Sequence, residues 1–87
     1  MAHLLIIHTV KEFSSWKAAF DAHHPSRKAG GCTSESVLRN NEKPNEVVMM
    51  FGWDSLANAR KFTQSPDLKQ AMEKAGVVGM PTIYFLD

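Results

Sequence analysis

The chain has 87 residues, ten basic and nine acidic side chains, a formal net charge of +1 and a single cysteine. This length allows one domain, and chains so short bury only about 60% of their unfolded surface, so a partner, a metal or disulfides often add stability. A lone cysteine excludes an internal disulfide and a thiolate zinc cage, and the scattered, nearly balanced charge argues against binding nucleic acid. We therefore expect a single domain over residues 1–87 that is stabilised by association with a partner.

The first third of the chain predicts a strand followed by a helix. Residues 4–10 are a short apolar run rich in β-branched side chains, typical of a strand buried on both faces. Aromatic and apolar side chains then recur every three or four positions, which predicts an amphipathic helix. Pro25 should end this helix soon after His24, and Gly30 and Gly31 permit a turn.

The rest of the chain predicts a hairpin, two helices and a last strand. Residues 32–40 resemble an edge strand, residues 40–45 are rich in turn formers, and residues 47–53 form a second continuous apolar run. Asp54 or Ser55 can cap one helix, and Ser65 followed by Pro66 starts another. Residues 81–86 complete the pattern as a strand.

This order, strand-helix-strand-strand-helix pair-strand, matches the ferredoxin-like βαββαβ arrangement, an α+β fold. Its first and third strands are central in an antiparallel sheet, and its helices cover one face only. Both central strands are apolar at nearly every position, and leaving four or five such side chains in water would forfeit about 1.5–3 kcal/mol each. We therefore expect the sheet face without helices to pair with a second copy of the chain, which gives a homodimeric α+β barrel.

Aromatic, charged and turn-forming residues spread over nearly the whole chain resemble one known group. These residues are Phe13, Trp16, Lys17, Phe20, Asp21, His23, Arg27 and residues 45–48, 53–55, 65–68, 76 and 77. The chain resembles the dimeric α+β barrel superfamily, which includes the antibiotic-biosynthesis-monooxygenase-like proteins, the muconolactone isomerases and the stress-responsive barrel proteins, and within it a small bacterial branch. The resemblance implies a homodimer with a cleft between the sheet and the helices of each subunit.

Two positions of the sequence bear on whether the chain binds haem. Haem-degrading members of the superfamily carry a Trp ten residues before an iron-ligating His, and the matching positions here are Phe62 and Met72. The missing His argues against haem, although methionine ligates iron in other proteins. The sequence also has no Gly-rich phosphate loop, nucleophile elbow or dinucleotide fingerprint, so we expect neither a cofactor nor a metal.

Two histidines are the candidates for acid–base catalysis. His8 ends an otherwise apolar central strand, where a ring with an ordinary pKa near 6.5 could transfer a proton or orient a ligand. His23 continues the apolar stripe of the first helix and should face the sheet. The alternative for His8 is a core histidine that is hydrogen-bonded to a neighbour, and for His23 and His24 a favourable place at the end of a helix.

Four further residues are candidates for ligand binding. Arg27 could pair with a ligand carboxylate or with Asp21 on the surface, and the surface pair is the commoner arrangement. Met49 could supply adaptable apolar lining, Trp53 ends a strand where loops meet pockets, and Tyr84 could offer a hydroxyl to a cavity. Each of these three could equally serve packing alone.

Two functions therefore remain open. The first is a cofactor-free monooxygenase or isomerase acting on an apolar small molecule, and the second is a ligand-binding or structural dimer without turnover. An open apolar cavity with His8 on its wall would favour the first, and a cavity filled by side chains the second. One free thiol and a start without an export signal lead us to expect a cytoplasmic protein without a membrane partner.

Overall fold

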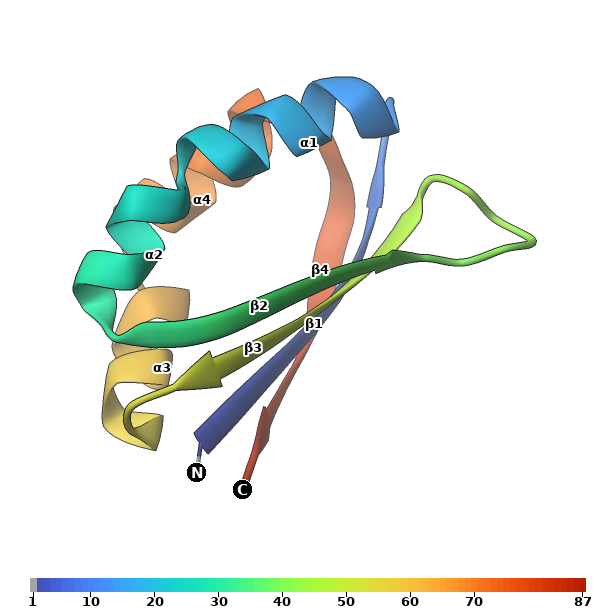
Figure 1. Ribbon diagram of the computed structural model, residues 1–87. Helices are drawn as coiled ribbons and strands as arrows, with labels where there is room; N and C mark the ends of the chain where they lie inside the picture. The colour runs from blue at the N-terminus through green and yellow to red at the C-terminus, as the bar shows by residue number, and fades with distance from the viewer. Residues whose placement is uncertain (1) are drawn as a thin grey trace.

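A computed structural model describes residues 2–87, the side chain of Asp67 excepted (Figure 1). In chain order these residues form β1 (Ala2–Val10), α1 (Phe13–Ala22), α2 (His24–Gly30), β2 (Cys32–Arg39), β3 (Glu46–Trp53), α3 (Leu56–Thr63), α4 (Pro66–Lys74) and β4 (Val77–Leu86). The predicted α+β class and the order of its strands are confirmed, but two helices, α1 and α2, stand between β1 and β2 where one was predicted. None of the helices in residues 2–87 is long and apolar enough to cross a bilayer.

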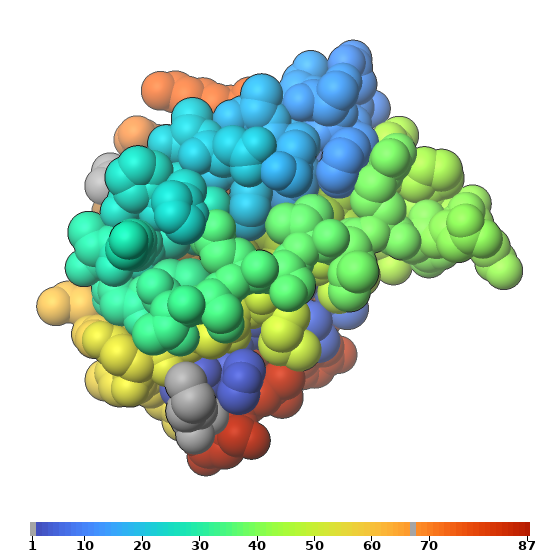
Figure 2. Space-filling view, viewed as in Figure 1, coloured from blue at the N-terminus to red at the C-terminus, as the bar shows by residue number. Residues whose placement is uncertain are grey.

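The strands form one antiparallel sheet in the order β2-β3-β1-β4, so β1 and β3 are central as predicted. In the register of the sheet, Leu5 of β1 lies between Met50 of β3 and Tyr84 of β4. Figure 1 shows the helices on one side of this twisted sheet. The turn between β2 and β3 projects from the body of the molecule, as the space-filling view also shows (Figure 2).

The core lies between the sheet and the helices because strand side chains alternate between the two faces. On β1, Leu4, Ile6, His8 and Val10 point towards the helices and are buried, whereas the residues between them are half-buried or exposed. On β3 the buried set is Val47, Met49, Phe51 and Trp53. Within one chain, therefore, the large apolar side chains that are fully buried on β1 and β3 are those that face the helices.

The opposite face of the sheet, here called the open sheet face, carries large apolar side chains. Leu5 and Ile7 of β1 and Val48 and Met50 of β3 lie there half-buried. The same face carries four exposed apolar side chains on the outer strands, Leu38, Val78, Tyr84 and Leu86. No helix of residues 2–87 covers them, so one chain leaves a continuous apolar surface in contact with water.

The structure differs from the sequence prediction at Pro25. The helical region does not end there: α1 ends at Ala22, His23 caps it, and α2 begins at His24 with Pro25 in its first turn. A proline is well tolerated at this position because the first amides of a helix have no partner in the helix, so the missing N–H removes no hydrogen bond. This break redirects the chain so that Arg27 of α2 points into the core.

The last strand also begins earlier than predicted, at Val77 instead of Pro81. The register of its pairing with β1 shifts next to His8: Ile7 pairs with Thr82, whereas Thr9 pairs with Val78. Gly79 in this bulge has a φ of 73°, a backbone conformation that glycine adopts at little cost.

Gly31 lies in the turn between α2 and β2, and we expect a side chain at this position to destabilise the protein. Its φ is 116°, and a Cβ atom there would lie 2.5 Å from Oδ1 of Asp54. Gly31→Ala should lower the free energy of unfolding by about 2 kcal/mol, because a strained φ and a steric clash act together. Urea denaturation measures this loss.

Gly79→Ala is the matched control, because its φ is also positive but no atom lies within 4 Å of the added Cβ. It should cost only about 1 kcal/mol. Equal losses at the two sites would show that the Asp54 contact is unimportant.

Candidate functional site

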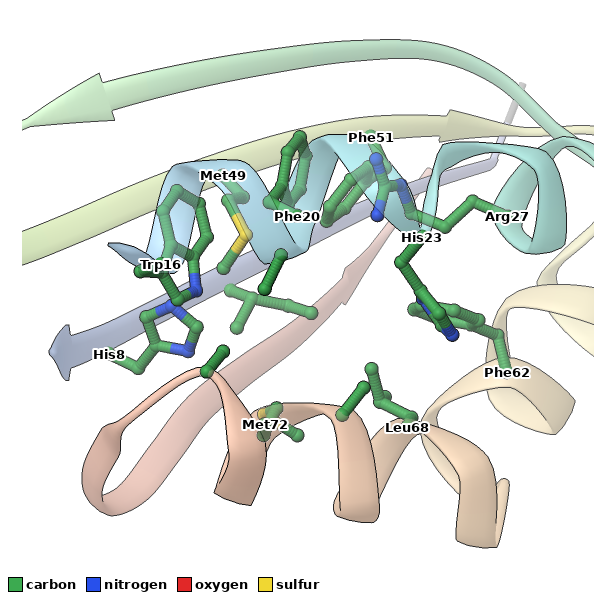
Figure 3. A pocket seen from close by; sticks show the side chains of 14 residues that line it. His8, Trp16, Phe20, His23, Arg27, Met49, Phe51, Phe62, Leu68 and Met72 are labelled. Carbon is green, nitrogen blue, oxygen red and sulfur yellow. The ribbon is translucent and has the colours of Figure 1, made fainter. Parts of the chain in front are cut away.

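A cleft lies between the sheet and the helices, lined mainly by apolar and aromatic side chains of β1, α1, β3, α3 and α4 (Figure 3). Its volume is about 50 Å³, and it is partly open to solvent. Figure 3 shows His8 and Trp16 at one end of the cleft and Arg27 at the other end. Leu68 and Met72 of α4 line the side of the cleft that lies across from Phe20 and Met49. The polar groups of the cleft are thus few and concentrated at its two ends.

His8 is brought to the cleft by the alternation of β1, which points it to the same side as Ile6 and Val10. Its side chain is 5% exposed, and neither ring nitrogen has a hydrogen-bond partner among the described residues. The imidazole packs edge-on against Trp16, with ring centroids 5.4 Å apart. Burial disfavours the charged ring and lowers the pKa of His8 to about 4, so it is neutral at pH 7.

The depressed pKa of His8 makes stability depend on pH. The unfolded chain, with its His pKa near 6.5, binds more protons than the folded chain between about pH 4 and pH 6.5. The contribution is therefore fully present above pH 6.5 and is lost as the pH falls towards 4, by up to about 3 kcal/mol. We expect urea midpoints measured at fixed protein concentration to fall over this range.

The same titration in two variants assigns the effect. His8→Phe should flatten the pH dependence between pH 4 and 6.5, whereas His24→Gln, at an exposed histidine, should keep it. A wild-type profile that is flat over this range would contradict a buried neutral His8.

His23 lies at the junction of α1 and α2 and lines the cleft, as its place in the apolar stripe predicted. The adjacent His24 points elsewhere: its Nδ1 lies 2.7 Å from Oε1 of Glu35, and its side chain is 53% exposed. The two neighbouring histidines thus have separate surroundings, because adjacent helical residues point about 100° apart.

Arg27 is buried, with an exposed fraction of 2%, and does not form the surface pair with Asp21 that we had considered. Asp21 pairs with Lys17 instead, and the guanidinium of Arg27 donates to Glu35 of β2. Arg27 also lies over the ring of Phe20, 3.7 Å from its centroid. It lines one end of the cleft with its charge already balanced by a carboxylate.

Glu35 is a polar residue of this region that the sequence analysis missed. Partial burial alone would raise the pKa of its carboxyl, but the hydrogen bonds and charges of Arg27 and His24 outweigh burial and hold the pKa below the usual range. Glu35 therefore stays ionised at neutral pH beside Arg27. A signal was present in the sequence, since Glu35 is the only acid in the strand that follows α2.

The other ligand-binding candidates divide between the cleft and the rest of the molecule. Met49 lines the cleft, and so do Phe62 and Met72. Trp53 lies on the same side of the sheet but is fully buried against Phe62, outside the lining of the cleft. Tyr84 pairs with Leu5 on the open sheet face, so its hydroxyl cannot reach the cleft.

Cys32 lies outside the cleft, at the start of β2. Burial raises the pKa of its thiol, and the nearby negative charge of Glu35 raises it further. A thiol protonated at neutral pH is a poor nucleophile. The imidazoles in the described lining of the cleft are those of His8 and His23.

An α+β sandwich with a small apolar cleft under its helices is the class of protein that fold and site define. Within this class, a family model described as antibiotic biosynthesis monooxygenase matches residues 11–74, more than half of the chain. The chain therefore belongs to the antibiotic biosynthesis monooxygenase family. No curated protein sequence matches it significantly.

Solved structures with the same fold include three informative examples. An antibiotic biosynthesis monooxygenase from Bordetella bronchiseptica superimposes with a TM-score of 0.84 at 16% identity, over 99% of this chain and 94% of that one. A similar protein from Caulobacter crescentus gives 0.78 at 16% identity, over 99% and 87%. SnoaB from Streptomyces nogalater, a cofactor-independent oxygenase, gives 0.74 at 15% identity, over 95% and 89%. At these identities the likeness establishes the fold.

Proposed function

We propose that the protein is a homodimer in which each subunit binds an apolar small molecule in its cleft and, without a cofactor, either isomerises it or oxidises it with dioxygen. In the oxidation the substrate supplies the electrons, one oxygen atom enters the product and the other leaves as water. The observation that carries this proposal is the buried imidazole of His8, which has no partner among the described residues, on the wall of a mainly apolar cleft. A neutral imidazole can accept or donate a proton, and His23 places a second imidazole in the lining of the cleft. Membership of a family that is described by monooxygenase activity, and a cofactor-independent oxygenase of the same fold, support the reaction class.

The open sheet face supports the homodimer. Apolar patches larger than a few hundred Å² are rare on monomeric proteins, and this face carries apolar side chains on every strand of the sheet. A two-fold axis lets the same surface cover itself in a second copy. The free, protonated Cys32 fits a reducing compartment, and we propose the cytoplasm.

A second candidate, a dimer that binds a ligand without turnover, is favoured by the size of the cleft. About 50 Å³ accommodates a few water molecules or a small group of atoms. A larger ligand requires Met49 and Met72 to move, which their unbranched side chains allow.

Native mass spectrometry of the freshly purified chain tests these proposals together. We expect a species of twice the 9.7 kDa chain mass that carries an additional small molecule. The molecule is then extracted, identified and incubated in air with wild-type protein and with His8→Phe and His23→Phe variants. Conversion by the wild type alone supports the enzyme, an unchanged ligand supports the binding protein, and a ligand-free monomer contradicts both.

A further inference from the structure

The surroundings of His8 restrict what can bind beside it. His8 is 95% buried, since its exposed fraction is 5%. It lies on the central strand β1 between Ile6 and Val10, and its ring packs edge-on against the ring of Trp16. Both nitrogens remain without a protein partner in the described residues. A buried donor and a buried acceptor without partners are unfavourable, so this end of the cleft favours a molecule that forms a hydrogen bond with at least one of the two nitrogens.

The charges around the cleft decide which kind of molecule this is. The ionisable side chains in its described lining are His8, His23 and Arg27. The charge of Arg27 lies at the opposite end and is balanced by Glu35. At the His8 end the neighbours are apolar or aromatic, so an ionised group placed there would lose its hydration without gaining an opposite charge.

We propose that His8 is the specificity-determining residue of the cleft and selects an uncharged ligand that carries a hydroxyl group, with the imidazole and the hydroxyl hydrogen-bonded to each other. This inference rests on the proposed function, because it assigns the class of ligand to the same cleft. A neutral imidazole has one donor and one acceptor nitrogen, and a hydroxyl is both donor and acceptor, so one hydroxyl can form a hydrogen bond with whichever of the two nitrogens faces it. A hydrocarbon leaves the imidazole unpaired, and a carboxylate brings an uncompensated charge.

Three probes of similar shape separate these possibilities: phenol, toluene and benzoate. Each is larger than the cleft of about 50 Å³, so its binding requires Met49 and Met72 to move aside. We expect titration of the full-length protein, followed by heteronuclear NMR, to show phenol binding at least about fivefold more tightly than toluene, with benzoate weakest. Phenol should also shift the imidazole nitrogen resonances of His8. His8→Leu should reduce phenol affinity about five- to thirtyfold and leave toluene affinity unchanged, which removes the preference.

His8→Gln is the conservative variant, since its amide offers both a donor and an acceptor, and it should retain most of the preference for phenol. His24→Ala is the matched control at an exposed histidine outside the cleft lining and should behave like the wild type. If His8→Leu does not fold, the His8 nitrogen shifts in the wild-type protein and the His8→Gln affinities still decide the question.

The outcomes distinguish this inference from the proposed function. Binding of phenol and toluene with equal affinity, or tightest binding of benzoate, overturns the role of His8 and leaves a ligand cleft in place. Failure of all three probes to shift any resonance of a cleft residue overturns the cleft as a binding site, and the inference with it.

Discussion

Replacing Ile7 with lysine should convert the proposed dimer into a monomer. Ile7 lies near the middle of β1 on the open sheet face, between Val48 and Thr82. A symmetric dimer formed through this face would bury two new ammonium groups in its interface, and burying a charge without a partner costs several kcal/mol. We expect the dissociation constant to rise at least about 100-fold.

Sedimentation velocity over a range of concentrations measures this change. Ala18→Lys adds the same charge at an exposed position of α1, in the helical layer, and should leave the dimer intact. In the monomer the long lysine side chain can reach water from the half-buried position, so the Ile7 variant should keep its circular dichroism spectrum. A wild-type protein that sediments as a monomer at micromolar concentration would refute the pairing of two sheets.

The second large effect is expected when the carboxylate of Glu35 is removed. Glu35→Ala leaves the guanidinium of Arg27 buried against Phe20 without an anionic partner among the described residues. Loss of one member of a buried ion pair typically costs 3–5 kcal/mol, and because Glu35 is partly exposed we expect about 3 kcal/mol. Chemical denaturation at pH 7 measures the loss.

Two further variants show whether the loss of stability comes from the unpaired, buried charge of Arg27. Arg27→Met combined with Glu35→Ala removes both charges and should recover part of the stability, because no unpaired charge remains. Asp21→Ala breaks the exposed pair with Lys17 and should cost less than about 1 kcal/mol. Similar losses in Glu35→Ala and Asp21→Ala would show that burial adds nothing to the Arg27 pair.

The fold was predictable because periodicity and start signals are local properties. Two continuous apolar runs, the helical stripe from Phe13 to His23, the cap at Ser55 and the proline at Pro66 each point to one element, and their order suffices for the ferredoxin-like arrangement. The Pro25 error is of the same local kind. A proline that ends one helix and a proline that begins the next look alike in a single sequence.

The cleft was predictable only in part. His8, His23, Arg27 and Met49 do line it, but Trp53 and Tyr84 do not. Alternation along a strand shows that neighbouring residues face opposite ways, yet it does not indicate which of the two sets faces the helices. For Tyr84 this choice depends on the pairing with β1, which is a long-range property.

The burial of Arg27 depends on the same kind of long-range contact. Its partner Glu35 lies eight residues away on a different element, and the two meet only because the helix break at His23 turns α2 towards the sheet. Sequence spacing alone favours partners three or four residues away on one helix, as Lys17 and Asp21 are.

Ile7 and His8 are joined by a single peptide bond, yet one belongs to the open sheet face and the other to the cleft. In the proposed dimer, the backbone of β1 would therefore separate the second copy of the chain from the ligand in the cleft. A movement of this strand that accompanies binding on one side would directly change the surface on the other side. Dimerisation is therefore best measured both with and without the small-molecule probe. Binding of the probe is best measured at protein concentrations above and below the dissociation constant of the dimer.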